Sequence, residues 1–174
     1  MIRTERLVLR TFREDDYAAM KAVIEDKMAS EWAPYDAQWS LDDERFGSTF
    51  RWLSSLNYWF AMEYEGDIIG FIVAQPSHDG LSRDIGYTVR RGMQRQGFAY
   101  EACAAIMRAA ARDEKLVKFT AGTAECNYPS AGLLRKLGFE PVMRHRAWFR
   151  KDENGEPMWF MGYSYECDAG RWRE

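Results

Sequence analysis

The sequence predicts one α/β domain over residues 1–174, in which helices pack on a mixed β-sheet. Three observations lead to this prediction. The length of 174 residues suits one domain with a substantial core. Apolar residues make up 47% of the chain and charged residues 29%, as in globular proteins. Segments with the period of strands alternate with segments of helical period, and no repeat, low-complexity tract or linker separates them.

The first half of the chain predicts a strand, two helices and three further strands. A strand over 7–10 precedes a helix that opens at Glu14. A second helix begins near Ser40, which has the spacing of a capping box to Asp43, and runs to about Leu56. A short turn, Glu-Gly-Asp, predicts a hairpin between the next two strands. The three strands are expected at 58–64, 68–73 and 83–89.

The second half predicts a helix, a strand, a short helix and two closing strands. After Gly97 the chain becomes rich in Ala and Glu, which predicts a helix to about Glu114. A strand over 117–125 follows, and then a helix over 129–137 that Gly138 ends. The closing strands are expected at 141–149 and 157–166, on either side of a turn at 152–155. The predicted order is β-α-α-β-β-β-α-β-α-β-β.

Charge, cysteines and hydropathy exclude several classes of function. The net charge of −3 argues against a nucleic-acid partner, because neutralising phosphates requires a basic surface. Cys103, Cys126 and Cys167 form no ligand cluster with histidines, so no metal site is expected, and Cys103 is interpreted as a core residue. No signal region and no run of about 18 apolar residues appear, so we expect no membrane partner and a cytoplasmic protein with reduced thiols.

The most informative segment runs from Val89 to Glu101, where a strand ends, a glycine turn follows and a long helix begins. The first N–H groups of a helix have no internal partners and lie at the positive end of the helix dipole. A pyrophosphate binds there if the residues are small enough for close approach. Gly97 and Ala99 are small, and Arg95 adds positive charge. The alternative interpretation is a glycine turn that only joins a strand to a helix.

Two common phosphate-binding loops do not fit this segment. Gly92 and Gly97 have the glycine spacing of a P-loop, but Phe98 and Ala99 stand where Lys and Ser or Thr are required. No GxGxxG motif follows an early strand, which argues against a dinucleotide-binding fold.

The pattern Gln94-x-x-Gly97-x-Ala99 resembles the coenzyme A signature of the GNAT superfamily of N-acetyltransferases. Its neighbours resemble the branch that contains the ribosomal-protein N-terminal (alanine or serine) acetyltransferases. The resemblance implies the GNAT fold with a mostly antiparallel central sheet, and acetyl-CoA as the co-substrate. Weak similarity covers most of the chain. The matching segments are 4–10, 84–89, 97–102, 127–130 and 137–139.

This resemblance implies a V-shaped gap between the strand that ends near Val89 and the strand that ends near Glu125. Pantetheine would lie in the gap like an extra strand, and a backbone N–H near Val89 would polarise the thioester carbonyl. The residues that the resemblance assigns to the cofactor are Tyr87, Thr88, Val89, Gln94, Arg95, Gln96, Gly97, Phe98, Ala99, Asn127 and Ser130.

Two residues are candidates for proton handling. Asp84 occupies an acidic position of the resembling branch and is the first choice for the general base, acting through water; the alternative is a solvated strand charge. Many members of the superfamily place a Tyr near the sulfur, where this chain has Leu134. Ser130 resembles the serine used instead in the ribosomal branch, although a helix-start role remains the alternative.

Aromatic residues mark the expected acceptor side. Trp32, Tyr35 and Trp39 lie between the first two predicted helices, where the resembling enzymes line the acceptor cleft, and Trp32 and Tyr35 join Asp84 as predicted substrate-binding residues. A satellite core under a long loop is the alternative. Aromatic residues of the closing strands would pack on the sheet or form a homodimer contact, and the sequence leaves both open. They are Trp148, Phe149, Trp159 and Phe160.

The leading hypothesis is an enzyme that acetylates a primary amine, either a protein N-terminal α-amine or a small-molecule amine. Direct attack on the thioester in a ternary complex is implied by the resemblance. The absence of the usual Tyr at Leu134 favours an alternative, a GNAT fold that binds acetyl-CoA as a sensor with weak or no transfer. A third hypothesis is an interaction protein that uses its aromatic surface.

Overall fold

The computed structural model describes residues 1–173, and within them one eight-stranded sheet has the order β1-β2-β3-β4-β5-β6-β8-β7. Neighbouring strands are antiparallel except β5 and β6, which are parallel. The strands are β1 (Ile2–Arg3), β2 (Leu7–Arg10), β3 (Trp59–Tyr64), β4 (Asp67–Pro76), β5 (Ser82–Val89), β6 (Lys118–Ala124), β7 (Glu140–Ala147) and β8 (Phe160–Asp168). The helices are α1 (Tyr17–Met28), α2 (Asp43–Ser54), α3 (Phe98–Ala111) and α4 (Tyr128–Lys136). Short 3₁₀ turns are η1 (Glu14–Asp16), η2 (Ala33–Tyr35), η3 (Arg91–Met93) and η4 (Ala169–Trp172).

This architecture confirms the predicted α/β class and its mostly antiparallel sheet. The two-residue strand β1 is an addition to the predicted order. The second helix begins at Asp43 rather than near Ser40, because the Asp42 side chain accepts a hydrogen bond from the Arg45 N–H at 3.1 Å and caps the helix. The last strand begins at Phe160 rather than at 157, and the segment before it forms only an isolated bridge between Lys151 and Pro157.

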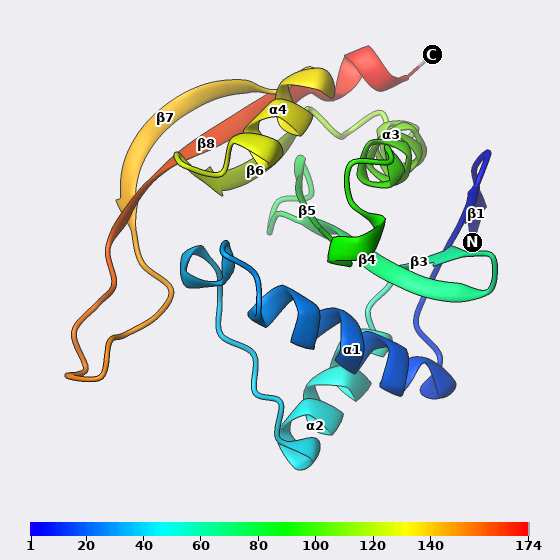
Figure 1. The fold of residues 1–174 in the computed structure, drawn as a ribbon. Coiled ribbons are helices and arrows are strands. Elements are labelled where there is room, and N and C mark those ends of the chain that lie inside the picture. The colour runs from blue at the N-terminus through cyan, green and yellow to red at the C-terminus, as the bar shows by residue number, and fades with distance from the viewer. Residues whose placement is uncertain (174) are drawn as a thin grey trace.

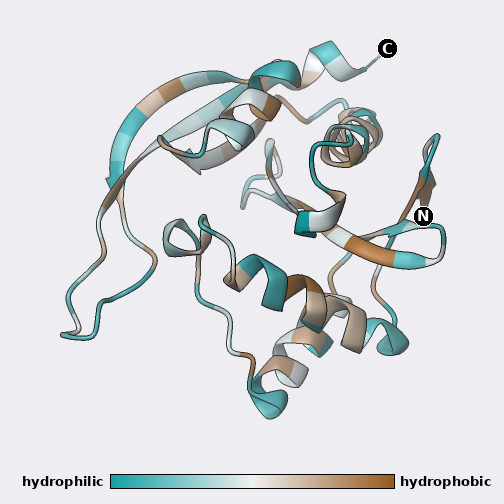
Figure 2. Cartoon of the chain, in the orientation of Figure 1, coloured by the Kyte–Doolittle hydropathy of each residue, from teal (hydrophilic) through white to brown (hydrophobic). Residues whose placement is uncertain are grey.

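The helices cover the two faces of the sheet, with α1 and α2 on one face and α3 and α4 on the other (Figure 1). Two apolar cores result. One lies under α3 and α4 and contains Met107, Phe119 and Tyr165, whereas the other lies under α1 and α2 and contains Ile24 and Phe46. Figure 2 shows a strongly hydrophobic stretch on β4, the strand between these helix layers. The two cores pack the sheet between the helix layers, and the site is built on this sheet.

The feature that creates the site is the separation of β5 from β6. The two parallel strands pair only from Ser82 opposite Lys118 to Asp84 opposite Thr120. Beyond this point they pair with other neighbours, β5 with β4 and β6 with β8. The edge of β5 from Ile85 onward therefore faces a gap, which confirms the V-shaped opening that the resemblance implies.

Three observations bear on the other expectations. Cys103 and Cys167 are buried, Cys126 is half-buried, and all three are free thiols. Within residues 1–173, no group of three or more His, Cys, Asp or Glu side chains is arranged to hold a metal ion. No helix in this range combines the length and hydropathy needed to span a membrane.

Candidate active site

A cleft of about 1160 Å³ occupies the gap between β5 and β6. This volume is slightly larger than the range of about 300–1,000 Å³ found for small-molecule sites. Its walls come from β5, β6, the start of α3, α4 and the connection between α1 and α2. Of the predicted site residues, all except Gln96 line it. The fold therefore brings the candidate cofactor, catalytic and acceptor residues together in one cleft.

The loop over residues 94–99 forms one end of the cleft. Arg95 has φ +62° and Gly97 has φ +87°, both in the left-handed region. Gly97 is the N-cap of α3, and within the described residues no side chain caps the first-turn N–H groups of this helix. Turns with left-handed residues create concave sets of N–H groups that bind anions. Arg91, Arg95 and Lys136 add positive charge to the same cleft. This arrangement could hold an anionic group such as a pyrophosphate.

The N-terminal segment braces this loop. The Arg6 guanidinium donates to the Gln96 carbonyl at 2.9 Å and pairs with Glu101 of α3 at 2.7 Å. The Thr4 hydroxyl donates to the same carboxylate at 2.5 Å. The side chain of Phe98 is only 2% exposed and packs in the core, so this residue faces the cleft through its backbone. The Gln96 side chain donates to the Gly92 carbonyl at 3.2 Å, outside the cleft lining.

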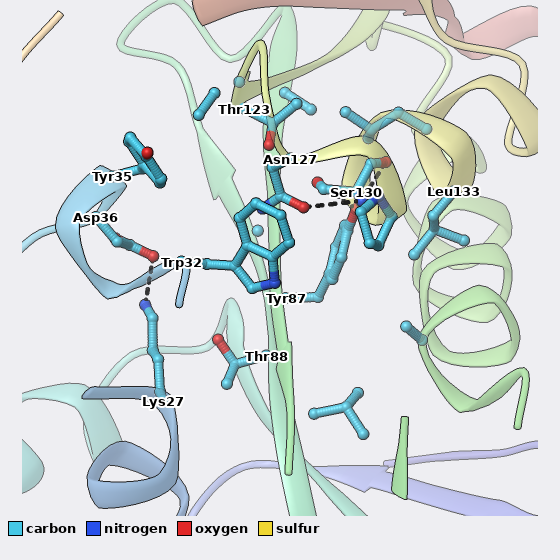
Figure 3. A pocket seen from close by; sticks show the side chains of 18 of the residues that line it. Lys27, Trp32, Tyr35, Asp36, Tyr87, Thr88, Thr123, Asn127, Ser130 and Leu133 are labelled. Carbon is cyan, nitrogen blue, oxygen red and sulfur yellow. Dashed lines mark hydrogen bonds and ion pairs between the residues drawn. The ribbon is translucent and has the colours of Figure 1, made fainter. Parts of the chain in front are cut away.

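Tyr87 and Ser130 meet in the middle of the cleft, as Figure 3 shows. Their hydroxyl oxygens are 2.9 Å apart. Asn127 caps α4, because its Oδ1 accepts from the Ser130 N–H at 3.2 Å. Leu134, on the same helix, is 1% exposed and belongs to the core. Ser130 is therefore the α4 residue whose hydroxyl meets that of Tyr87.

Asp84 lies at the point where β5 and β6 separate. One oxygen of its carboxylate accepts a hydrogen bond from the Thr120 hydroxyl at 2.8 Å. The side chain keeps access to solvent through the cleft, yet the surrounding walls displace much of its hydration. This desolvation raises the pKa of Asp84, and the hydrogen bond from Thr120 offsets only part of the effect. A carboxylate with a raised pKa, located in a cleft, is a candidate proton acceptor.

The acceptor side is closed by two segments far apart in the sequence. Tyr35 of η2 packs edge-on against Phe160 of β8, with ring centroids 5.4 Å apart. Arg150, in the hairpin between β7 and β8, donates from Nε to the Asp36 carbonyl at 3.1 Å. Lys27 of α1 pairs with the Asp36 carboxylate at 2.6 Å, an interaction visible in Figure 3. The hairpin therefore folds back onto the α1–α2 connection and completes the wall beside Trp32.

Several lining residues could not be found from the sequence. His145 of β7 lines the cleft, and its buried Nδ1 has no hydrogen-bond partner within residues 1–173. Phe149 and Phe160 stack with centroids 5.8 Å apart and also line it, whereas the exposed pair Trp148 and Trp159 does not. The sequence could show only that aromatic residues cluster there, because the fold of the hairpin decides which ones face the cleft.

Comparisons with known proteins agree with this geometry. A family model described as an acetyltransferase (GNAT) domain matches residues 6–140. The uncharacterized N-acetyltransferase YnaD of Bacillus subtilis (strain 168) is 24% identical over 171 residues, which cover 98% of both chains.

Solved structures share the fold. A GNAT-family acetyltransferase from Bacillus anthracis superposes with a TM-score of 0.79 at 22% identity, covering 97% of this chain and 98% of the other. The ribosomal-protein-S5-alanine acetyltransferase from Vibrio fischeri superposes with a TM-score of 0.78 at 18% identity, covering 99% and 98%. The chain therefore belongs to the acetyltransferase (GNAT) domain family and is an N-acetyltransferase enzyme.

Proposed function

We propose that this protein transfers the acetyl group of acetyl-CoA to a primary amine by direct attack in a ternary complex. The observation that carries the proposal is the cleft between β5 and β6. It has a helix start with uncapped N–H groups at one end and the carboxylate of Asp84, with its raised pKa, on its wall. One cleft thus offers room for both reactants, and holding them together supplies several kcal/mol of the barrier reduction.

The proposed cofactor contacts follow the two walls. The 94–99 loop would hold the pyrophosphate through its backbone N–H groups, with Arg95 beside it. The free edge of β5 at Tyr87–Val89 would bond the pantetheine, and Asn127 and Ser130 would approach it from α4. Gln96, whose side chain is held by Gly92, contributes only through its backbone.

The proposed chemistry assigns one residue to the proton of the amine and another to the departing sulfur. Acetyl-CoA supplies the thioester carbonyl that the amine attacks. Asp84 accepts the proton that the ammonium form of the acceptor must lose, through a water molecule. Ser130 faces the sulfur as the C–S bond breaks. A free thiol has a pKa of about 8.5, so the departing thiolate needs only modest stabilisation.

The acceptor is either a protein N-terminal α-amine or a small-molecule amine. Aromatic walls suit the apolar part of either acceptor, and Trp32 and Tyr35 are the proposed contacts. The structural relative from V. fischeri is named as a ribosomal-protein alanine acetyltransferase, which supports testing an α-amine first.

The deciding experiment is thiol release from acetyl-CoA with a panel of amines, run beside a thermal-shift titration with acetyl-CoA. The panel contains peptides with free N-termini, the same peptides with blocked N-termini and a lysine side chain, and small amines. Release with one class of amine is the expected result and identifies the acceptor. Stabilisation by acetyl-CoA without release from any amine would refute transfer and leave a sensor. If acetyl-CoA neither stabilises the protein nor releases its thiol with any amine, the proposed use of the cleft is refuted.

A further inference from the structure

The hydroxyl groups of Tyr87 and Ser130 form a pair that joins the two walls of the cleft. Tyr87 comes from β5 and Ser130 from the first turn of α4, and they are separated by 43 residues in the chain. The Tyr87 oxygen lies 2.9 Å from Ser130 Oγ and 3.4 Å from the Ser130 carbonyl oxygen. Figure 3 shows the phenol directed at the start of α4. The pair lies in the part of the cleft that the proposed function assigns to the thioester.

Either hydroxyl of this pair can donate to the other. Burial raises the pKa of Tyr87, and the hydrogen bond with Ser130 offsets only part of this effect. The phenol therefore keeps its proton and has one to donate. The Ser130 N–H is already bound to Asn127, which fixes the backbone of the serine. When Tyr87 donates to Ser130 Oγ, the serine proton is left free for another acceptor, since a hydroxyl has one donor and two lone pairs.

Leu134 of α4 is packed in the core and carries no hydroxyl. A lone serine hydroxyl rotates freely and is a weak donor. A hydrogen bond that it accepts restricts this rotation and polarises its own O–H bond. Tyr87 supplies such a bond from the opposite wall.

We propose that Tyr87 is a positioning residue, which donates to Ser130 Oγ and directs the Ser130 proton at the sulfur of coenzyme A. This inference rests on the proposed function. The amine nitrogen forms the new C–N bond, and the electron pair of the breaking C–S bond moves to sulfur. The thiolate accepts a hydrogen bond from Ser130 and then takes a proton from solvent. Nitrogen loses one proton from its ammonium form before the attack and a second once the C–N bond has formed; both leave through Asp84 and water, and Tyr87 stays protonated throughout.

The first test is a double-mutant cycle with Tyr87→Phe and Ser130→Ala, followed by thiol release. Tyr87→Phe should lower kcat about tenfold while KM for acetyl-CoA changes by less than twofold. Ser130→Ala should lower kcat by about one to two orders of magnitude. The double variant should be no slower than Ser130→Ala, because Tyr87 acts only through the serine. Tyr165→Phe is the matched control, a tyrosine of the same core outside this cleft, and should keep wild-type turnover.

The second test does not require transfer. The thiol pKa of enzyme-bound coenzyme A is measured from the ultraviolet absorbance of the thiolate. Tyr87→Phe and Ser130→Ala should each raise this pKa, Tyr87→Phe by about one unit, which corresponds to the tenfold effect on rate. If the wild-type protein transfers acetyl to no amine, the proposed function fails, and this titration still decides the role of Tyr87. Unchanged kcat or additive losses in the cycle, or an unchanged thiol pKa in Tyr87→Phe, would overturn the inference.

Discussion

Asp84→Asn offers a quantitative test of the proposed base. The substitution keeps the shape of the side chain and its contact with Thr120, and removes the ability to accept a proton. Without a base, only the free form of the amine reacts. For an α-amine with a pKa of about 8, roughly 10% is free at pH 7 and about 90% at pH 9. The rate should therefore fall about tenfold at pH 7 and recover almost fully at pH 9.

An acceptor that resembles lysine gives a different profile. With a pKa of about 10.4, the free amine is about 0.04% at pH 7 and about 4% at pH 9. The expected loss is then on the order of a thousandfold at pH 7, within the range of about 10²–10⁴ for general bases, and still about 25-fold at pH 9. The size of the recovery thus identifies the class of amine.

The pKa of Asp84 also fixes the sign of the wild-type pH dependence. The base must be ionised to act, so kcat/KM falls as the pH drops through its pKa. Desolvation raises this pKa, which moves the acidic limb to a higher pH than an exposed aspartate would give. The assay is thiol release between pH 5 and 9, with Glu166→Gln as control, since Glu166 lies on β8, two strands away from β5, and pairs with Lys118. A loss in Asp84→Asn that is constant across this range would show that Asp84 holds the acceptor or the strand, and wild-type activity at every pH would refute the assignment.

Three further predictions concern the 94–99 loop, the hairpin between β7 and β8, and the buried ion pair of Arg10 and Asp16. Acetyl-CoA at about 100 times its Kd should stabilise the protein by about 2.7 kcal/mol in a thermal shift. Gly97→Val should abolish the shift, because the position has φ +87°, whereas Gly92→Val, where an added Cβ meets no atom within 4 Å, should keep it. Arg150→Ala removes the hydrogen bond to the Asp36 carbonyl and should raise KM for the amine roughly two- to tenfold. The thermal stabilisation by acetyl-CoA should stay unchanged in this variant. Asp16→Ala removes the hydrogen bonds between Asp16 and the buried Arg10, which keeps only its pair with Glu63, and should cost about 1.5–3 kcal/mol in urea unfolding.

Local sequence signals were enough to predict the elements and the 94–99 loop. Periodicity depends on neighbouring residues, and a glycine before an Ala-rich helix is a local feature, so the start of a helix after Gly97 could be predicted, and the structure makes Gly97 its N-cap. Boundaries were less accurate where two capping residues compete. Ser40 and Asp42 both suit an N-cap, and the structure uses Asp42 because its carboxylate reaches the Arg45 N–H.

Contacts between distant segments could not be predicted in the same way. The bond between Thr120 and Asp84 depends on the register of two parallel strands, and the approach of Phe160 to Tyr35 depends on a hairpin that folds back. Phe98 illustrates the same limit, since its position in the loop suggested a cofactor contact but not that its side chain is buried. The sequence therefore locates the site and leaves the direction of its side chains to the fold.

The alternation of side chains along β5 explains how one strand serves both the proposed base and the proposed hydroxyl pair. Successive side chains of a strand point to opposite faces, so Asp84 and Tyr87, three residues apart, cannot share a face. Ile85 and Val89 pack with Tyr87 in the core under α3 and α4, which assigns Tyr87 to the face of Ser130. Asp84 consequently belongs to the face of α1 and α2, where Trp32 and Tyr35 approach. A single rigid strand thus separates the proposed base on the amine side from the proposed hydroxyl pair on the sulfur side, and a one-residue register shift of β5 would disable both.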